Sequence, residues 1–382
     1  MKKIKVIFEQ YAIPHYRVPF FSGLAKKTDL LVIASKSPKK NDGINDILNP
    51  AEFRSIRLES NPDSGLYHPE IIEVIKKENP DLIISWGSSL RLMLSNKSFL
   101  SLIREKGIKT AWMGCDGYDV HNFIIGALLQ FLPRRILRTL RDLLITRRVD
   151  RFIAHSSHML NFLRLVKWIP ENKITLVNNA INTSDISSFY KKWKTEQRSR
   201  KKYGIVFIGR LVPRKNIERL IEAFSYIAPK YPESTLLIIG EGSFEKNLKN
   251  LVRNLNIGDK VKFLGGIYDN HSLAENICQN SLFILPGVGG LSFNTAMAAG
   301  LPIIHTYADG TEEDLIKEGV NGWFFDGTTK DLVKKIDVAL SDSERLEQMG
   351  EQSEHFITNI FNLENMVNGY VSVIEKIAEK YD

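Results

Sequence analysis

The chain has 382 residues, more than one ordinary hydrophobic core accommodates, so two domains are expected. Its composition, 43% hydrophobic and 25% charged, is that of a soluble globular protein. The net charge of +8 favours anionic partners such as nucleotides, phosphates, acidic lipid or nucleic acid, and does not choose among them. The alternative is a basic protein whose charge serves no partner.

The N-terminal residues and the cysteines indicate the compartment in which the protein is expected and the kinds of site that are not expected. The start, MKKIKVIFEQ, lacks a signal-peptide pattern because its apolar run is short and Glu9 interrupts it. No stretch reaches the ~18 apolar residues of a membrane span. Cys115 and Cys278 are far apart and have no neighbouring His pair, which argues against a disulfide framework or zinc site. We therefore expect a protein of the reducing cytoplasm.

Short apolar runs alternate with amphipathic segments from the first residues onward. Such continuous apolar runs are typical of buried parallel strands. In chain order they are 4–8, 30–34, 81–85, 109–113, 151–155 and 173–177, with helices expected at 16–27 and 69–77 between them. The pattern restarts at 203–209 and continues through 235–240, 260–265, 281–286 and 301–306. A short helix is expected at 291–299 and an amphipathic tail helix at 363–381.

Two successive βαβ series predict an α/β protein of two doubly wound, Rossmann-like domains facing a cleft. The break falls in the polar, turn-rich and highly charged stretch 178–200. We expect an N-terminal domain over 1–182 and a C-terminal domain over 183–362. The tail helix, 363–382, is expected to pack back onto the N-terminal domain.

Loops that follow the strands of the C-terminal half carry the best candidates for chemistry. Arg210 and Lys215 follow a strand and precede a helix, where a guanidinium fork and an ammonium suit a pyrophosphate. The alternative is a solvated loop with incidental charge. The stretch 286–302, PGVGGLSFNTAMAAGLP, has no charged side chain, but its glycines allow a ligand to approach the backbone. Gly240-Glu241-Gly242 is read as a turn rather than a phosphate loop, because an isolated GxG is weak.

These stretches, in this order and spacing, resemble the glycosyltransferase group 1 family of retaining, GT-B, nucleotide-sugar enzymes. The resemblance is carried by GRLVPRKN (209–216), LLIIGEG (236–242), VKFLGG (261–266), GGLSFNTAMAAGLPII (289–304) and GVNGWFF (319–325). In the N-terminal half it is carried by PHYRVPFFSGLAK (14–26), FIAHSSHML (152–160) and NNAIN (178–182).

The resemblance implies roles for individual residues. Arg210 and Lys215 would bind the donor diphosphate and act in catalysis. Gly289, Gly290 and Leu291 would offer backbone N–H groups, and Gly265 and Ile267 would read the nucleobase through backbone. The remaining expected donor contacts are Gly209, Ser292 and Thr295.

One departure from the family pattern concerns two glutamates, eight residues apart, that the family commonly has. The matching positions here are Gly287 and Thr295, so neither carboxylate is present. Thr295 keeps a hydroxyl, and Gly287 offers only backbone. A charged contact to the donor ribose would become a neutral one, which costs on the order of 1 kcal/mol.

The sequence pattern is less specific for the acceptor-binding residues of the N-terminal half. Glu9, His15, Tyr16 and Arg17 follow the first strand, so the last three are assigned to acceptor binding, with packing or surface roles as the alternative. Asp116 is the nearest polar residue to the position where relatives place a sugar-contacting His, and it is assigned a catalytic role, with a turn role as its alternative.

A basic amphipathic stretch, 123–148, interleaves arginines with long apolar side chains. It suits an anionic membrane surface, and its alternatives are a domain helix or a nucleic-acid contact. The arginines assigned to membrane contact are Arg134, Arg135, Arg138 and Arg141.

The sequence therefore predicts a retaining glycosyltransferase that moves a sugar from a nucleotide diphosphate sugar, expected to be a UDP-sugar, to a glycan or lipid-linked acceptor in cell-surface polysaccharide synthesis. No metal and no further cofactor is expected, and no nucleic-acid partner. The expected location is the cytoplasm, at the inner face of the membrane. The alternative function is a non-catalytic GT-B partner subunit that keeps nucleotide binding.

Overall fold

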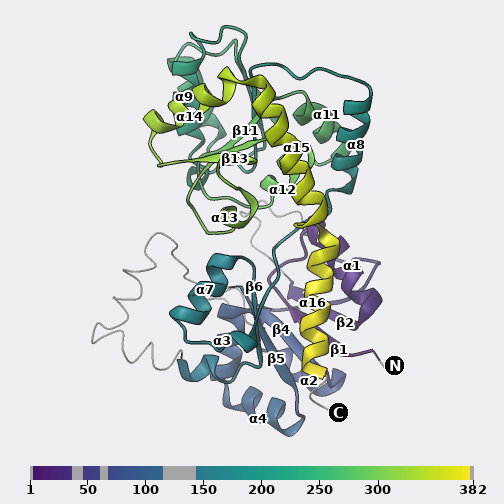
Figure 1. Ribbon diagram of the computed structural model, residues 1–382. Coiled ribbons are helices and arrows are strands. Elements are labelled where there is room, and N and C mark those ends of the chain that lie inside the picture. The colour runs from purple at the N-terminus through teal and green to yellow at the C-terminus, as the bar shows by residue number, and fades with distance from the viewer. Residues whose placement is uncertain (1–2, 37–45, 61–67, 115–142, 379–382) are drawn as a thin grey trace, which may run out of the picture. The chain divides into compact units, whose positions relative to one another are not determined.

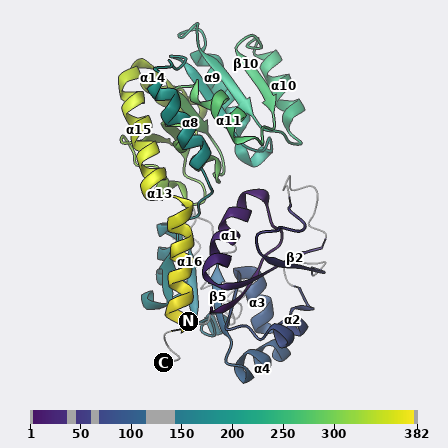
Figure 2. The same cartoon turned by 90° about the vertical axis from the view of Figure 1, so that its right-hand side faces the viewer.

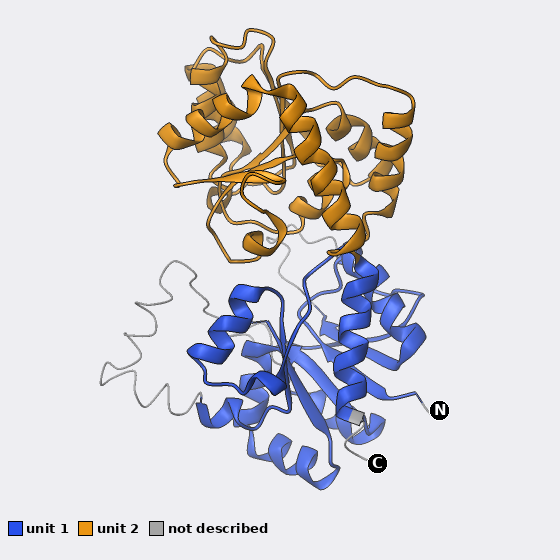
Figure 3. Ribbon diagram, viewed as in Figure 1, with its two compact units in different colours: residues 1–181, 363–382 blue, residues 182–362 orange. Residues whose placement is uncertain are grey.

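The computed structural model describes residues 3–36, 46–60, 68–114 and 143–378 (Figure 1). The chain forms two compact units, residues 1–181 with 363–382 and residues 182–362 (Figure 3). Each unit is built on one parallel sheet with helices, so the prediction of two doubly wound, Rossmann-like domains is confirmed.

The sheet of unit 1 has the strand order β3-β2-β1-β4-β5-β6-β7, and all neighbouring strands are parallel. The strands are β1 (Lys5–Glu9), β2 (Asp29–Ser35), β3 (Arg54–Leu58), β4 (Leu82–Trp86), β5 (Lys109–Met113), β6 (Arg151–Ala154) and β7 (Ile174–Leu176). The helices are η1 (His15–Arg17), α1 (Val18–Lys27), α2 (Ile71–Glu78), α3 (Gly87–Ser95), α4 (Lys97–Glu105), α7 (Ser157–Leu165), η3 (Glu171–Lys173) and α16 (Leu363–Ala378).

Both faces of this sheet are covered, which explains the unbroken apolar runs of its strands. Val6 and Phe8 point into one core cluster, where Phe20 of α1 and Tyr370 of α16 pack. Ile7, the residue between them, points into a second cluster on the other face. Neither face is left to solvent, so no polar residue needs to alternate with apolar ones along the central strands.

The C-terminal helix α16 is part of unit 1 (Figures 1 and 2). Tyr370 is fully buried, and its ring centroid lies 4.8 Å from that of Phe20. Its hydroxyl lies 3.0 Å from Nε2 of the buried His155. Burial lowers the pKa of His155 to about 3, so the imidazole is neutral there at physiological pH.

The sheet of unit 2 has the order β10-β9-β8-β11-β12-β13, again parallel throughout. Its strands are β8 (Gly204–Ile208), β9 (Thr235–Ile239), β10 (Val261–Gly265), β11 (Leu282–Leu285), β12 (Ile303–Thr306) and β13 (Gly322–Phe325). The helices are α8 (Ser184–Thr195), η4 (Pro213–Lys215), α9 (Ile217–Ile227), α10 (Glu245–Asn254), α11 (Asn270–Cys278), α12 (Ser292–Ala298), α13 (Glu312–Leu315), α14 (Thr329–Ser341) and α15 (Ser343–Asn359).

Two strands do not follow from the apolar pattern. β3 reads RSIRL, and most of its residues are exposed or half-buried because it is the edge strand next to β2. β13 is one of the two edge strands of unit 2 and lies next to β12. In the described ranges, no helix is long and apolar enough to cross a membrane.

Candidate functional site

The sheet of unit 2 has a topological switch point between β8 and β11. The chain runs from β8 outward to β9 and β10, and then returns to the other side of β8 for β11, β12 and β13. In open α/β sheets, ligands bind beyond the carboxyl ends of the strands at such a point. The two predicted donor loops, 209–216 and 286–291, leave the sheet there.

Lys215 joins these two loops. It ends η4 and is buried, with 8% of its surface exposed. Its Nζ donates hydrogen bonds to the carbonyl oxygens of Val288, at 2.7 Å, and Gly289, at 2.6 Å. Burial, with smaller contributions from the charges of Arg214 and Arg210, lowers the pKa of Lys215 to about 8. The half-buried Arg210 therefore lies near enough to add to the positive potential at this point.

Gly287 fixes how closely the two loops approach. A Cβ at this position would lie 2.4 Å from the carbonyl oxygen of Arg214 and 2.4 Å from the carbonyl carbon of Lys215. The amide of Val288 donates to that same Arg214 oxygen at 3.0 Å. The backbone of the first loop thus occupies the space that a side chain at position 287 would need. A glutamate side chain at position 287 would therefore not fit the loop conformation found here.

The glycine loop presents backbone donors. Within the described part of the chain, no hydrogen bond uses the amides of Gly289, Gly290 or Leu291. Gly290 has φ +140°, which favours glycine, and a Cβ at this position would lie 3.8 Å from Lys215 Nζ. Ser292 begins α12, and its buried Oγ has no partner among the described residues. Thr295 is buried on the same helix, 6% exposed.

The remaining predicted donor residues lie on neighbouring loops of the same sheet edge. Gly209, with φ +149°, follows β8, and a Cβ at Gly240 would meet its carbonyl oxygen at 1.9 Å. Gly240 is therefore required by close backbone packing, in agreement with the turn interpretation. Gly265 ends β10 with φ +71°, and Ile267 follows it, half-buried.

Strand β12 and the loop that follows it add polar groups that the sequence pattern did not single out. His305 is fully buried, and burial lowers its pKa to about 4. Its Nδ1 contacts the carbonyl oxygen of Leu285 on β11. Asp309 raises the pKa of both His305 and Lys215, so its carboxylate is near the switch point. An apolar strand ending in His, directly before a polar turn, is the signal that could have identified this loop.

The predicted acceptor residues of unit 1 lie on η1, after β1. His15 and Tyr16 are exposed, with ring centroids 5.4 Å apart. Arg17 is half-buried and donates to Oδ1 of Asn179 at 2.6 Å and to the sulfur of Met366 at 3.5 Å. Arg17 thus connects η1 to α16 and to the NNAIN turn, while His15 and Tyr16 keep accessible surface.

Glu9 lies at the switch point of unit 1, between β1 and β4, and it is buried. Its carboxylate is 2.7 Å from His68 Nδ1, and it accepts hydrogen bonds from Ser85 Oγ at 2.5 Å and Ser89 Oγ at 2.9 Å. These contacts satisfy the carboxylate inside the unit. Glu9 therefore organises the edge of this sheet.

Several predicted residues lie outside the described residues. These are Asp116 and the four arginines assigned to membrane contact, Arg134, Arg135, Arg138 and Arg141. Their proposed roles stay predictions.

The two parallel-sheet domains, with loops gathered at the switch point of each sheet, define a protein of the GT-B fold. Two family models match it: residues 22–185 match Glycosyltransferase Family 4, and residues 189–356 match Glycosyl transferases group 1. Together these matches span most of the chain, and the protein belongs to these glycosyltransferase families.

Individual relatives are distant. The chain is 26% identical over 248 residues to an uncharacterized glycosyltransferase of Haemophilus influenzae, which covers 64% of this chain and 66% of that protein. It is 28% identical over 215 residues to N-acetyl-alpha-D-glucosaminyl L-malate synthase of Bacillus anthracis, covering 53% of this chain and 54% of that one. In both cases the match spans less than two thirds of the relative.

Solved structures agree in fold over the whole length. HepE of Anabaena, solved in complex with UDP, matches with a TM-score of 0.69 at 17% identity, covering 99% of both chains. Sucrose-phosphate synthase of Thermosynechococcus elongatus matches with a TM-score of 0.73 at 18% identity, covering 99% of this chain and 100% of that one. At such identities the likeness establishes the GT-B fold alone.

Proposed function

We propose that the protein is a retaining glycosyltransferase that moves a sugar from a nucleotide diphosphate sugar to a glycan or lipid-linked acceptor. The observation that carries this proposal is the combination of two cations and several backbone donors at the switch point of unit 2. Lys215 and Arg210 bring positive charge. The amides of residues 289–291 bring N–H groups that make no hydrogen bond within the described chain. This combination suits a diphosphate attached to a neutral sugar.

The names of relatives and neighbours support the donor class. HepE was solved with UDP and with UDP-glucose, and a relative in Mycolicibacterium smegmatis is a GDP-mannose-dependent mannosyltransferase. We propose a UDP-sugar as the donor of this protein. The acceptor proposal, a cell-surface glycan or its lipid-linked precursor at the cytoplasmic face of the membrane, rests on the predicted basic segment and on the family.

In this proposal the protein acts mainly on the leaving group. As the bond between the sugar and the diphosphate breaks, negative charge grows on the diphosphate, and Lys215 and Arg210 stabilise it. The acceptor hydroxyl attacks the same face of the sugar that the diphosphate leaves, and the diphosphate oxygen accepts the hydroxyl proton. Retention of configuration follows from this geometry. No carboxylate at position 287 is needed, because the step relies on charge stabilisation and positioning.

The experiment is a calorimetric titration of the full chain with UDP-, GDP- and ADP-sugars, followed by assays of hydrolysis and transfer. We expect one nucleotide sugar to bind and to be hydrolysed slowly without acceptor. Arg210→Ala should lower the turnover rate, because it removes about 2–4 kcal/mol of transition-state stabilisation. Binding with neither hydrolysis nor transfer would favour the non-catalytic partner subunit, and binding of none would reject the donor proposal.

A further inference from the structure

At the carboxyl edge of the unit 1 sheet, one guanidinium is held by described groups that carry no negative charge. Arg17 ends η1, the short helix that follows β1, and it is half-buried. Its Nη2 donates to Oδ1 of Asn179 at 2.6 Å, and its Nη1 donates to the sulfur of Met366 at 3.5 Å. Its guanidinium carbon lies 5.6 Å from the ring centroid of Phe20. An amide, a thioether and an aromatic ring therefore hold this side chain in place.

The charge of Arg17 has no counter-charge in the described part of the chain. Burial lowers the pKa of Arg17, and the groups that act in the opposite sense are the phenols of Tyr370 and Tyr16, with no carboxylate among them. Burial also lowers the pKa of His155 to about 3, and the charge of Arg17 adds to this shift. The imidazole is therefore neutral at physiological pH, and the guanidinium is the charged group of this cluster.

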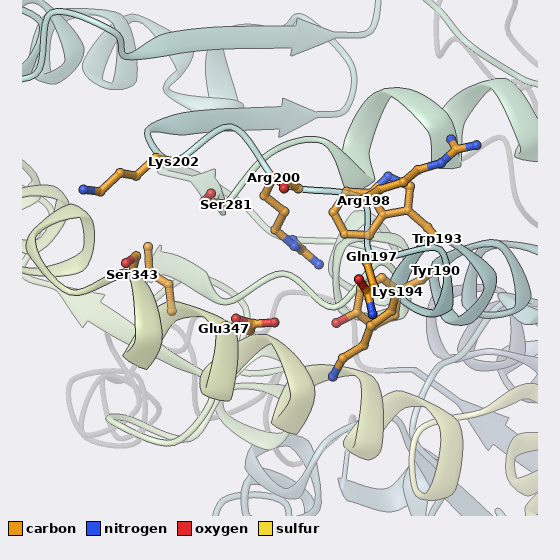
Figure 4. Close-up of a pocket in the computed structure, with 12 residues that line it drawn as sticks. Tyr190, Trp193, Lys194, Gln197, Arg198, Arg200, Lys202, Ser281, Ser343 and Glu347 are labelled. Carbon is orange, nitrogen blue, oxygen red and sulfur yellow. The ribbon is translucent and has the colours of Figure 1, made fainter.

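The surroundings of Arg200 in unit 2 show the contrast. Its guanidinium also donates to uncharged groups, the carbonyl oxygens of Asn280 and Ala299, both at 2.8 Å. However, the carboxylate of Glu347 lines the same pocket as Arg200 (Figure 4). The protein itself thus places a negative charge in the space around Arg200, whereas none of the described carboxylates acts on Arg17.

A charge that is partly removed from water costs stability unless an opposite charge compensates it. An apolar side chain at position 17 could fill the space beside Phe20 and Met366 without this cost. A bound anion would supply the missing counter-charge, so the presence of a guanidinium here points to a negatively charged ligand.

Two further donors lie beside the guanidinium. Because Oδ1 of Asn179 accepts from Arg17, the NH2 group of the same amide is directed elsewhere, and no described residue accepts from it. The Tyr16 hydroxyl lies near enough to act on the pKa of Arg17, and it forms no hydrogen bond with a described residue. Tyr16 is 37% exposed, so this group of donors is open to solvent.

We propose that Arg17, Asn179 and Tyr16 bind an oxyanion of the acceptor, either a phosphate or a carboxylate. In open α/β sheets, ligands bind beyond the carboxyl ends of the strands, where these residues lie. A guanidinium fork with neighbouring N–H and O–H donors matches the oxygens of either anion. The assignment of the anion to the acceptor rests on the proposed function, whereas the binding of an anion at Arg17 does not.

The test measures anion binding to the full chain carrying Lys215→Met, so that the donor loops contribute less. Glycerol phosphate and glycerate are titrated calorimetrically at low salt into this protein and into the same protein with Arg17→Gln or Lys26→Gln. Lys26 is exposed and lies about 13 Å further along α1, so it is a control for the same change of charge. We expect Arg17→Gln to weaken binding about tenfold or more and Lys26→Gln about twofold or less.

Asn179→Asp provides a second test that leaves Arg17 in position. The substitution places a carboxylate beside the guanidinium and supplies the missing counter-charge from within the protein. The midpoint of thermal unfolding should therefore not fall, while anion binding should weaken about tenfold or more, because the charge of Arg17 is already compensated.

The two probes distinguish the two anions. A preference of about tenfold for glycerol phosphate supports a phosphate on the acceptor, and similar or tighter binding of glycerate supports a carboxylate. The proposal is overturned if neither probe binds, if folded Arg17→Gln and Lys26→Gln proteins lose equal affinity, or if a folded Asn179→Asp protein binds as tightly as its parent. Titration of UDP into the unmodified chain tests the donor assignment separately, because the donor loops belong to unit 2.

Discussion

At the scale of single residues, the protonation state of Lys215 should control nucleotide binding. Its pKa of about 8 means that the ammonium loses its charge just above physiological pH. A diphosphate prefers the charged form, so binding takes up a proton when the side chain is neutral beforehand. The dissociation constant for UDP should therefore rise with pH, by about fourfold between pH 7 and 8.5. Calorimetric titrations across this range measure it.

The control for this pH dependence is a variant in which Lys215 itself is replaced. In Lys215→Met the affinity for UDP should be lower, and its change between pH 7 and 8.5 should disappear. In Arg210→Ala the affinity should also be lower, but the pH dependence should persist because Lys215 is still present. An unchanged slope in Lys215→Met would assign the titration to another group.

A second residue-scale prediction concerns Gly287. The smallest side-chain substitution, Gly287→Ala, places a methyl group 2.4 Å from the backbone of Arg214 and Lys215. Backbone cannot move aside as a flexible side chain can, so the two donor loops must separate. We expect a loss of about 1–3 kcal/mol in the free energy of unfolding, together with weaker UDP binding. Denaturant unfolding and calorimetry measure the two effects.

Gly258→Ala is the matched control, because a Cβ there meets nothing within 4 Å and Gly258 is exposed. It should leave both the stability and UDP binding nearly unchanged. If Gly287→Ala behaved like Gly258→Ala, the close approach of the two loops would not be a feature of the protein in solution.

At the scale of elements, a buried carboxylate shapes the loop between β12 and α13. Glu312 is fully buried and accepts hydrogen bonds from the amides of Ala308, at 2.6 Å, and Asp309, at 3.3 Å. Burial raises the pKa of Glu312, so its charge is unfavourable while its hydrogen bonds are favourable. The loop that places Asp309 near Lys215 thus depends on an acceptor oxygen more than on a charge.

This distinction gives a prediction. Glu312→Ala removes the acceptor and should lower the free energy of unfolding by about 1–3 kcal/mol, since two backbone amides lose their partner. Glu312→Gln keeps one acceptor oxygen without the charge, while its NH2 group cannot accept from the second amide, so it should lose clearly less stability than Glu312→Ala. Denaturant unfolding of both variants at pH 7 measures the difference, and equal losses would show that the charge itself matters.

The sequence predicts well those elements that the pattern of neighbouring residues identifies by itself. Central strands such as β1 and β4 are buried on both faces, so they read as continuous apolar runs. β3 escapes the same reasoning because an edge strand with half-exposed residues resembles a loop. The positions of Arg210 and Lys215 at a strand end follow from the same pattern.

The contact between Lys215 and the glycine loop could not be predicted in this way. It joins residues more than seventy positions apart, and its carbonyl acceptors leave no trace in the side chains. The same holds for the position of Gly287: the sequence reveals that the glutamate is absent, whereas only the packing of the two loops explains why a side chain is excluded. His305, on β12, and Asp309, in the loop that follows, escape sequence reasoning because this stretch carries no recognised spacing.

At the scale of the whole molecule, the two units are formed from different numbers of chain segments. Unit 2 is one continuous segment, 182–362, whereas unit 1 is completed only by α16 at the end of the chain. The two sheets share a design in which the switch point carries polar residues, Glu9 in one and Lys215 in the other. They differ in what covers the sheet, since one face of unit 1 lies under α1 and α16 together.

Truncation after Asn362 should therefore unfold unit 1 and leave unit 2 intact. The truncation removes buried apolar side chains of α16, namely Met366, Val367, Tyr370, Val373, Ile374 and Ile377. At about 1.5–3 kcal/mol for each buried side chain, the loss is comparable with the whole stability of a typical domain. Hydrogen exchange followed by mass spectrometry should show lost protection in β1 and β4 and retained protection in β8 and β11.

A substitution on the exposed side of α16 separates this effect from a general sensitivity of the C-terminal segment. Glu375 is exposed, so Glu375→Ala should preserve protection in both units. UDP binding gives the second readout, because the donor loops lie entirely in unit 2 and should keep their affinity in the truncated chain. Retained protection of β1 after truncation would mean that α16 covers the core of unit 1 without being needed for its fold. Loss of UDP binding in a protein whose β8 and β11 stay protected would mean that the nucleotide site requires residues of unit 1.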